Sequence, residues 1–168
     1  LNDGEPYVEG DFLKKGWDSV REIIKKSKEK DLVSITLNGA QTLPASVLSE
    51  IKGKDISLNL DMENGFIWKI NGTSITAETP ADIDLSVTNT AEYIPAALYS
   101  LISTNQNDFG FHLGRSGAFD FPAVLSVKAD ASCAGLMANL FWYDAENGIL
   151  QCIQTVTVGG AFERSIPY

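Results

Sequence analysis

The only histidine of the chain, His112, is the first residue to consider for catalysis. It lies between Phe111 and Leu113 in an alternating segment. A histidine can act as a general base near neutral pH, but only within hydrogen-bond reach of a substrate or nucleophile. The alternation of a strand turns His112 away from the face that its apolar neighbours share. The favoured interpretation is therefore a half-exposed strand residue, and a catalytic base is the alternative.

Acidic residues two positions apart are the second candidates for chemistry. Glycosidases need two carboxyl groups that face each other across a cleft. Turn preference offers a simpler explanation for two of the pairs, because residues 61–65 and 144–148 both read Asp-x-Glu-Asn-Gly. Converging acidic turns could also hold calcium, although no EF-hand spacing is present. The three pairs are Asp61 with Glu63, Asp82 with Asp84, and Asp144 with Glu146.

The remaining motifs do not indicate a catalytic, metal or cofactor site. Gly114-Arg115-Ser116-Gly117 lacks the spacing of a nucleophile elbow, and no glycine-rich phosphate loop is present. The sequon Asn71-Gly72-Thr73 also reads as a tight turn. The turn at 144–148 would place Cys152 opposite a residue near Leu140, so we favour two free thiols over a Cys133–Cys152 disulfide. Two cysteines cannot form a four-ligand zinc site. We expect no enzyme activity and no cofactor.

Aromatic residues offer a binding chemistry instead. Along Leu136–Tyr143, Trp142 belongs to one face of an alternating segment and Tyr143 to the other. Tyrosine and tryptophan side chains that are exposed can stack on the apolar faces of sugar rings. The alternative is that packing covers both faces. We predict Trp142, Tyr143 and Tyr99 as ligand-binding residues.

Composition limits the classes of partner. The chain has 168 residues, of which 44% are hydrophobic and 21% charged, and its net charge is −9. Nucleic acids and anionic membranes attract basic proteins, so neither is an expected partner. No apolar run reaches the roughly 20 residues that span a bilayer. The polar N-terminus lacks both a signal-peptide core and a starting methionine, which indicates an excised or processed piece.

Short alternating segments predict a mainly β fold with one helix near Trp17–Lys30, capped by Asp18. Two similar segments, 43–51 and 94–102, each contain Pro-Ala before apolar residues at helical spacing. They indicate a duplication, although two halves of similar design could also arise by chance. We therefore predict a β-sandwich of two pseudo-repeated halves with short helical turns. The predicted organisation is a lead-in or linker over 1–15 and one module over 16–168, with pseudo-repeats near 32–76 and 82–129 and a meander over 136–168.

Six short motifs follow one another along the chain: Gly16–Val20, Pro44-Ala45, Ile51–Ile56, Asp61–Gly72, Ile94–Ala96 and Ala138–Tyr143. Taken in this order, they resemble a poorly characterised β-rich module of multi-module extracellular proteins of Gram-positive anaerobes. The resemblance covers about residues 16–168. It implies an accessory unit beside anchoring, adhesion or polysaccharide-degrading modules, and it carries over no catalytic residues. The family ends in a last strand rich in aromatic and β-branched residues, whereas this chain stops at Pro167-Tyr168.

The expected function is recognition by a non-catalytic accessory module that is extracellular or at the cell surface. Its partner would be a polysaccharide, another surface component or a protein module of the same parent chain. The alternative is a structural spacer or docking support with no ligand of its own, and hydrolase activity is an outlier. Exposure of Trp142 and Tyr143 distinguishes these hypotheses, because recognition needs exposed aromatic rings and a spacer does not.

Overall fold

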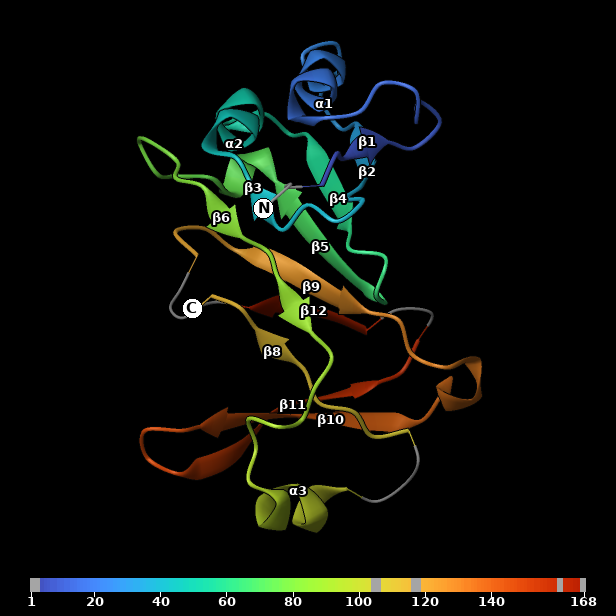
Figure 1. Cartoon of the computed structure of the whole chain (residues 1–168), viewed down its shortest axis with the longest axis vertical. Coiled ribbons are helices and arrows are strands. Elements are labelled where there is room, and N and C mark those ends of the chain that lie inside the picture. Colours follow the sequence, from blue (N-terminus) through green and yellow to red (C-terminus); the bar gives the residue numbers. More distant parts are fainter. Residues whose placement is uncertain (1–3, 104–106, 116–118, 160–161, 167–168) are drawn as a thin grey trace. The chain divides into compact units, whose positions relative to one another are not determined.

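A computed structural model describes residues 4–103, 107–115, 119–159 and 162–166 (Figure 1). The described chain is mainly β, with α-helices at 17–24, 45–51 and 96–102. It divides into two units. Unit 1 contains residues 1–86, 113–127 and 163–168, and unit 2 contains residues 87–112 and 128–162.

A six-stranded sheet organises unit 1. Its strand order is β1-β2-β4-β5-β9-β12 (Figure 1). Strands β2 and β4 are parallel, and the connection between them contains a helix, as parallel neighbours require. The pairs β1–β2, β4–β5 and β5–β9 are antiparallel. The strands are β1 (Tyr7–Val8), β2 (Leu32–Thr36), β4 (Ser57–Asp61), β5 (Phe66–Asn71), β9 (Ala123–Val127) and β12 (Phe162–Ile166).

Strand alternation gives this sheet one apolar face and one face that is mainly polar over β2 and β4. Leu60 pairs with Trp68, which pairs with Leu125, and all three side chains are buried. Helices α1 (Trp17–Ile24) and α2 (Ala45–Ile51) contact each other (Figure 1). Each helix also buries apolar residues of its own. The opposite face carries the cross-strand row Ser34, Asn59 and Lys69. Because one face is apolar and the other mainly polar, the register of the sheet is strongly specified.

The first helix is shorter than its sequence pattern predicts. It ends at Ile24 and not at Lys30, because the amides of Lys26 and Ser27 bond three residues back instead of four. Its N-cap is Gly16, with φ of 93°, so the prediction of Asp18 as the cap is wrong. By contrast, α2 confirms the helix expected after Pro44, which occupies the N-cap.

The two Asp-x-Glu-Asn-Gly turns are built alike. In the β4–β5 turn the Asp61 carboxylate accepts a hydrogen bond from the Glu63 amide at 2.7 Å. In the β10–β11 turn the Asp144 carboxylate accepts one from the Glu146 amide at 3.0 Å. The last glycine has a positive φ in both turns, 91° and 65°. Both hairpins predicted from these motifs are confirmed.

The predicted sandwich of two repeated halves is not confirmed. Half 32–76 supplies β2, β4 and β5, which are neighbours in one sheet. In half 82–129, β6 (Ile83–Asp84) pairs with β3 (Thr42–Leu43), β7 (Val87–Thr88) pairs with β8 (His112–Leu113), and β9 joins the large sheet. The two halves therefore have different hydrogen-bonding patterns despite their similar Pro-Ala segments.

Unit 2 contains α3 (Ala96–Ile102) and the antiparallel hairpin of β10 (Met137–Asp144) and β11 (Ile149–Thr157). The hairpin forms a two-stranded sheet with a register shift after Leu140, where Ile153 is an extra residue on β11. The predicted meander is wrong in one respect, because β12 joins the sheet that contains β9 and does not join β11. No residue of α3 is buried.

Part of the predicted lead-in over residues 1–15 belongs to the folded structure. Residues of the predicted lead-in form β1, which pairs with Ile35 and Thr36 of β2, so this segment contributes a strand to the sheet of unit 1. Within the described ranges, no helix combines the length and the apolar character that crossing a bilayer requires. The short helices 72–74 and 131–133 complete the regular structure.

Candidate functional site

Trp142 lies on an open face of the β10–β11 hairpin. The side chains of directly opposed residues in an antiparallel pair share a face. Trp142 is opposite Gln151, and Leu140 is opposite Gln154. We call these four residues the Trp142 face. Trp142 is 40% exposed and Gln151 is also exposed, so an apolar ring lies beside an amide that can donate and accept hydrogen bonds.

The Trp142 face is almost free of charge. Asp144 is the only charged residue in β10 or β11. Its carboxylate accepts hydrogen bonds from the side-chain amide of Asn147 at 2.6 Å and from the backbone amide of Glu146 at 3.0 Å. The bond from the Asn147 side chain, followed by the backbone bonds, lowers the pKa of Asp144. The Asp144 carboxylate therefore stabilises the turn. The Trp142 face, with so little charge, suits an uncharged ligand.

The other two predicted site residues lie elsewhere in unit 2. Tyr143 follows Trp142 on β10, so its ring points to the opposite face of the hairpin. Tyr99 belongs to α3, and both tyrosines are half-buried. Among the ring–ring contacts of the described residues, none joins Trp142, Tyr143 or Tyr99. Trp142 is thus the centre of the candidate site, and the structure does not group the three residues.

His112 has an aromatic partner, Tyr93. Its imidazole stacks on the Tyr93 ring, with centroids 3.8 Å apart and planes 19° from parallel. His112 is half-buried, and Tyr93 is 60% exposed. In the described part of the chain, no hydrogen bond or ion pair to the imidazole accompanies this stack. The contact holds β8 to the segment that precedes α3.

The acidic pairs act as hydrogen-bond acceptors for the backbone. The Asp82 carboxylate accepts a hydrogen bond from the Ala45 amide at 2.8 Å, at the first residue of α2. The Asp84 carboxylate accepts one from the Ser86 amide at 2.8 Å. Helix N-termini have unpaired N–H groups that carboxylates satisfy well. Sequence spacing alone did not reveal that Asp82 caps a helix 37 residues earlier.

Metal-binding side chains are scattered. Over the residues that the structure describes, no group of three or more histidine, cysteine, aspartate or glutamate side chains could hold an ion. Cys133 is half-buried and Cys152 is exposed, and both are free thiols. Cys152 lies opposite Phe141, one residue from the predicted Leu140, in the register that continues unbroken from the 144–148 turn up to the bulge.

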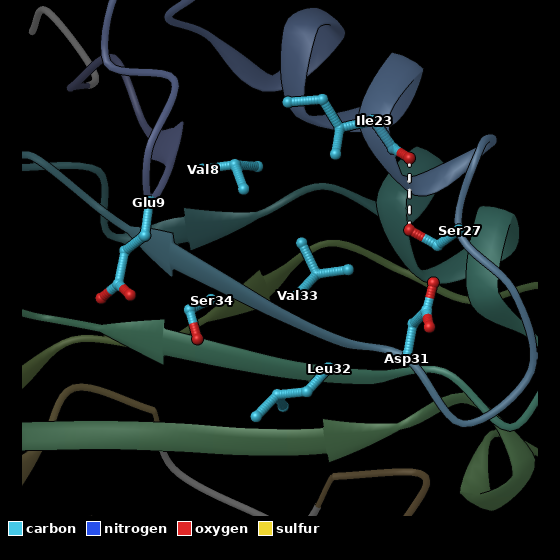
Figure 2. A pocket seen from close by; sticks show the side chains of 8 residues that line it. All are labelled: Val8, Glu9, Ile23, Ser27, Asp31, Leu32, Val33 and Ser34. Carbon is cyan, nitrogen blue, oxygen red and sulfur yellow. Dashed lines mark hydrogen bonds between the residues drawn. The ribbon is translucent and has the colours of Figure 1, made fainter.

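Unit 1 has a shallow hollow of about 390 Å³ where β1 ends beside β2 (Figure 2). Figure 2 shows the carboxylates of Glu9 and Asp31 at its two ends, and the Ser27 hydroxyl donating to the Ile23 carbonyl at 3.2 Å. Asp31 already accepts a hydrogen bond from the Lys28 amide at 2.7 Å. No histidine lines the hollow, and its two acids do not face each other, so it lacks the paired groups of an acid–base site.

Residues Gln151 and Gln154 of the Trp142 face were missed by sequence reasoning. The turn at 144–148 sets the register that places Gln151 opposite Trp142, so that signal was available. The bulge that places Gln154 opposite Leu140 had no comparable signal. Comparison with known proteins adds no further residue, because no family model, curated protein or solved structure matches the chain. The site is therefore defined by its own geometry.

Proposed function

We propose that this protein is a non-catalytic module that recognises a neutral polysaccharide through the Trp142 face. The exposure of Trp142 beside Gln151 is the observation that carries the proposal. A pyranose ring has an apolar face that stacks on indole and a rim of hydroxyl groups that bond to amides. Asp144 is the only charged residue in β10 and β11, and its carboxylate bonds to the turn, which favours a neutral sugar over an acidic one. The module would work outside the cell or at its surface, as the resemblance implies.

The exposure of Trp142 also provides an experimental signal. Trp68 is 1% exposed and Trp17 is half-buried, so Trp142 is the most solvent-accessible of the three indoles. A sugar ring that stacks on it replaces water and shifts its emission to shorter wavelength. The shift would be measured by titration with soluble β-glucan, xylan and mannan, together with affinity electrophoresis of the full chain in gels that contain each polymer.

Two variants give a matched comparison on adjacent residues. Trp142→Ala is expected to weaken binding about 10-fold or more, because the stacking surface is lost. Tyr143→Ala removes a ring from the opposite face and should leave affinity within about 2-fold. Equal losses in both variants would contradict the proposal, as would the absence of retardation and of an emission shift with every polymer.

The second candidate function is a spacer or docking support without a ligand. The half-burial of Tyr143 and Tyr99 favours it, because rings engaged in packing are not free to stack on sugars. This alternative predicts unchanged Trp142 emission across the whole polysaccharide panel. Its support is weaker than that of recognition, since it leaves the exposure of Trp142 without a role.

A further inference from the structure

Asparagine followed by glycine is a dipeptide that can deamidate without an enzyme. The glycine nitrogen attacks the side-chain Cγ of asparagine and closes a succinimide ring, and the glycine proton leaves with the side-chain amine as ammonia. Water then opens the ring to aspartate or isoaspartate. Glycine favours the reaction because it has no side chain to crowd the attacking nitrogen. The chain contains four such pairs: Asn38-Gly39, Asn64-Gly65, Asn71-Gly72 and Asn147-Gly148.

The Asn71 pair is held at both groups that take part in the reaction. The side-chain nitrogen of Asn71 donates to Asp55 and to Ser57, each at 2.9 Å. The Gly72 nitrogen, which would attack, donates to the Ile56 carbonyl at 3.0 Å. A hydrogen bond that must break costs about 1 kcal/mol, and each 1.4 kcal/mol of barrier slows a reaction about tenfold. The fold therefore protects Asn71.

Asn64 and Asn147 occupy the same position in the two Asp-x-Glu-Asn-Gly turns, so their immediate neighbours in sequence are identical. Their surroundings in the fold differ. The Asn64 side chain accepts a hydrogen bond from the Phe66 amide at 3.2 Å, and Phe66 is a buried residue of the six-stranded sheet. Asn38 is held by a distant segment, since its side chain donates to the Glu5 carbonyl at 3.1 Å.

The Asn147 pair is held only by its own turn. The Asn147 side chain donates to the Asp144 carboxylate at 2.6 Å. Over the described residues, no hydrogen bond engages the Gly148 amide, and a Cβ on this glycine would meet no atom within 4 Å. Ile149, which follows, is 46% exposed, and the hairpin has only two strands. Such hairpins are marginally stable in water, so opening this turn disturbs little packing.

We propose that Asn147 is a site of spontaneous deamidation, and that the fold directs the reaction to it and away from the other three pairs. The product carries a carboxylate in place of the amide that donates to Asp144, so a hydrogen bond is replaced by a repulsion between like charges. Isoaspartate also lengthens the turn that sets the β10–β11 register. The modification does not depend on polysaccharide binding, so the two proposals stand or fail separately.

The test is incubation of the full chain at mildly alkaline pH, with tryptic peptides analysed by mass spectrometry at successive times. Trypsin places the four pairs in different peptides, 31–52, 55–69, 70–115 and 129–164. In the folded chain, Asn147 should react about 3-fold or more faster than Asn64 and about 10-fold or more faster than Asn71. The same chain in guanidinium chloride is the control. There Asn64 and Asn147 should react within about 2-fold of each other, because their neighbours are identical.

Asn147→Gln assigns the signal, since peptide 129–164 also contains Asn139. This variant keeps a side-chain amide at the turn and should abolish deamidation of the peptide. Deamidation that persists in the variant would overturn the proposal. Equal rates at Asn64 and Asn147 in the folded chain, or a faster reaction at any of the other three pairs, would also overturn it. An equally large preference for Asn147 in guanidinium chloride would do so too, because the fold would then have no part in the selection.

Discussion

Unit 1 and unit 2 belong to one chain but bury their side chains very differently. The apolar residues that are buried in the described chain all belong to unit 1, except Val87 and Val158. Both units expose some large apolar side chains, but unit 2 exposes more of them, among them Leu101 at 79% and Met137 at 68%. A core of packed apolar groups supplies most of the free energy of folding. Unit 1 therefore has a core of buried apolar residues that can stabilise its fold, whereas unit 2 has few such residues.

Charge separates the two units as well. Unit 2 contains one basic residue, Lys128, and all other lysines and arginines lie in unit 1. Few charges and exposed apolar side chains are the properties of a surface that binds a partner or a ligand.

The comparison of the two units also shows that aromatic residues of similar sequence pattern have different roles. Trp68 fills a core and donates its indole N–H to the Leu85 carbonyl at 2.9 Å, whereas Trp142 faces solvent.

Replacing one tryptophan in each unit provides the strongest test of this difference. Trp68→Ala leaves a large cavity and an unpaired Leu85 carbonyl, so we expect the free energy of unfolding to fall by about 3–5 kcal/mol. Trp142→Ala should cost less than about 1 kcal/mol, because its ring is exposed. Chemical denaturation followed by far-UV circular dichroism measures both. Similar losses would mean that both units share one cooperative core.

Glycine-to-alanine changes test how closely the backbone packs in each unit. A Cβ at Gly72 would meet the carbonyl oxygens of Ile51 and Lys54, where the end of α2 lies against the short helix 72–74. We expect Gly72→Ala to lower the free energy of unfolding by about 1–3 kcal/mol. Gly159 in unit 2 has open space around it, so Gly159→Ala should stay within about 0.5 kcal/mol. Thermal unfolding of both variants gives the comparison, and a larger loss at Gly159 would contradict it.

Carboxylate caps provide a smaller contrast. Asp82→Ala removes the acceptor for the Ala45 amide at the start of α2, and we expect a loss of about 1 kcal/mol. In unit 2, Asp130 accepts a hydrogen bond from the Ser132 amide at 2.8 Å in the same manner. Asp130→Ala should leave the unfolding midpoint of unit 1 unchanged. A shared shift would show that the two units unfold together.

The smallest expected effect is the pH dependence of the β10–β11 turn. Hydrogen bonds from Asn147 lower the pKa of Asp144 in the folded chain. The stabilisation is therefore complete above the unfolded pKa of about 3.9, and it is lost as the pH falls through the folded value. The amide resonances of Asn147 should titrate with a midpoint below about 3.9, and Asp144→Asn should abolish this titration. A midpoint at or above the ordinary value would contradict the assigned hydrogen bonds.

Local sequence signals predicted the local structure well. Asp-x-Glu-Asn-Gly specified both hairpin turns, because aspartate accepts backbone bonds and glycine adopts positive φ. Proline before an apolar run specified α2. Local sequence signals failed where contacts with a segment far away in the chain determine the structure. Residues 109–113 alternate like a strand, yet only His112–Leu113 pair, and Gly110 lies close against Ala91.

The candidate site was predictable only in part. Trp142 was identified from its residue type and its place in an alternating segment, and its exposure agrees with the recognition hypothesis. Grouping it with Tyr143 and Tyr99 was not supported, because adjacent strand residues point to opposite faces and Tyr99 belongs to a helix. Gln151 could be found from the turn register, whereas Gln154 depended on a bulge that leaves no clear sequence pattern.

By itself, the sequence determined the turns, the alternation of the strands and the near absence of charge in β10 and β11, since each depends on neighbouring residues. Only the tertiary structure decided that β2 and β4 are parallel neighbours, that Asp82 caps α2, and that β12 joins β9. These pairings join residues far apart in the chain, and their energy depends on which apolar faces are buried together. Sequence order does not contain that information, because many pairings satisfy the same local pattern.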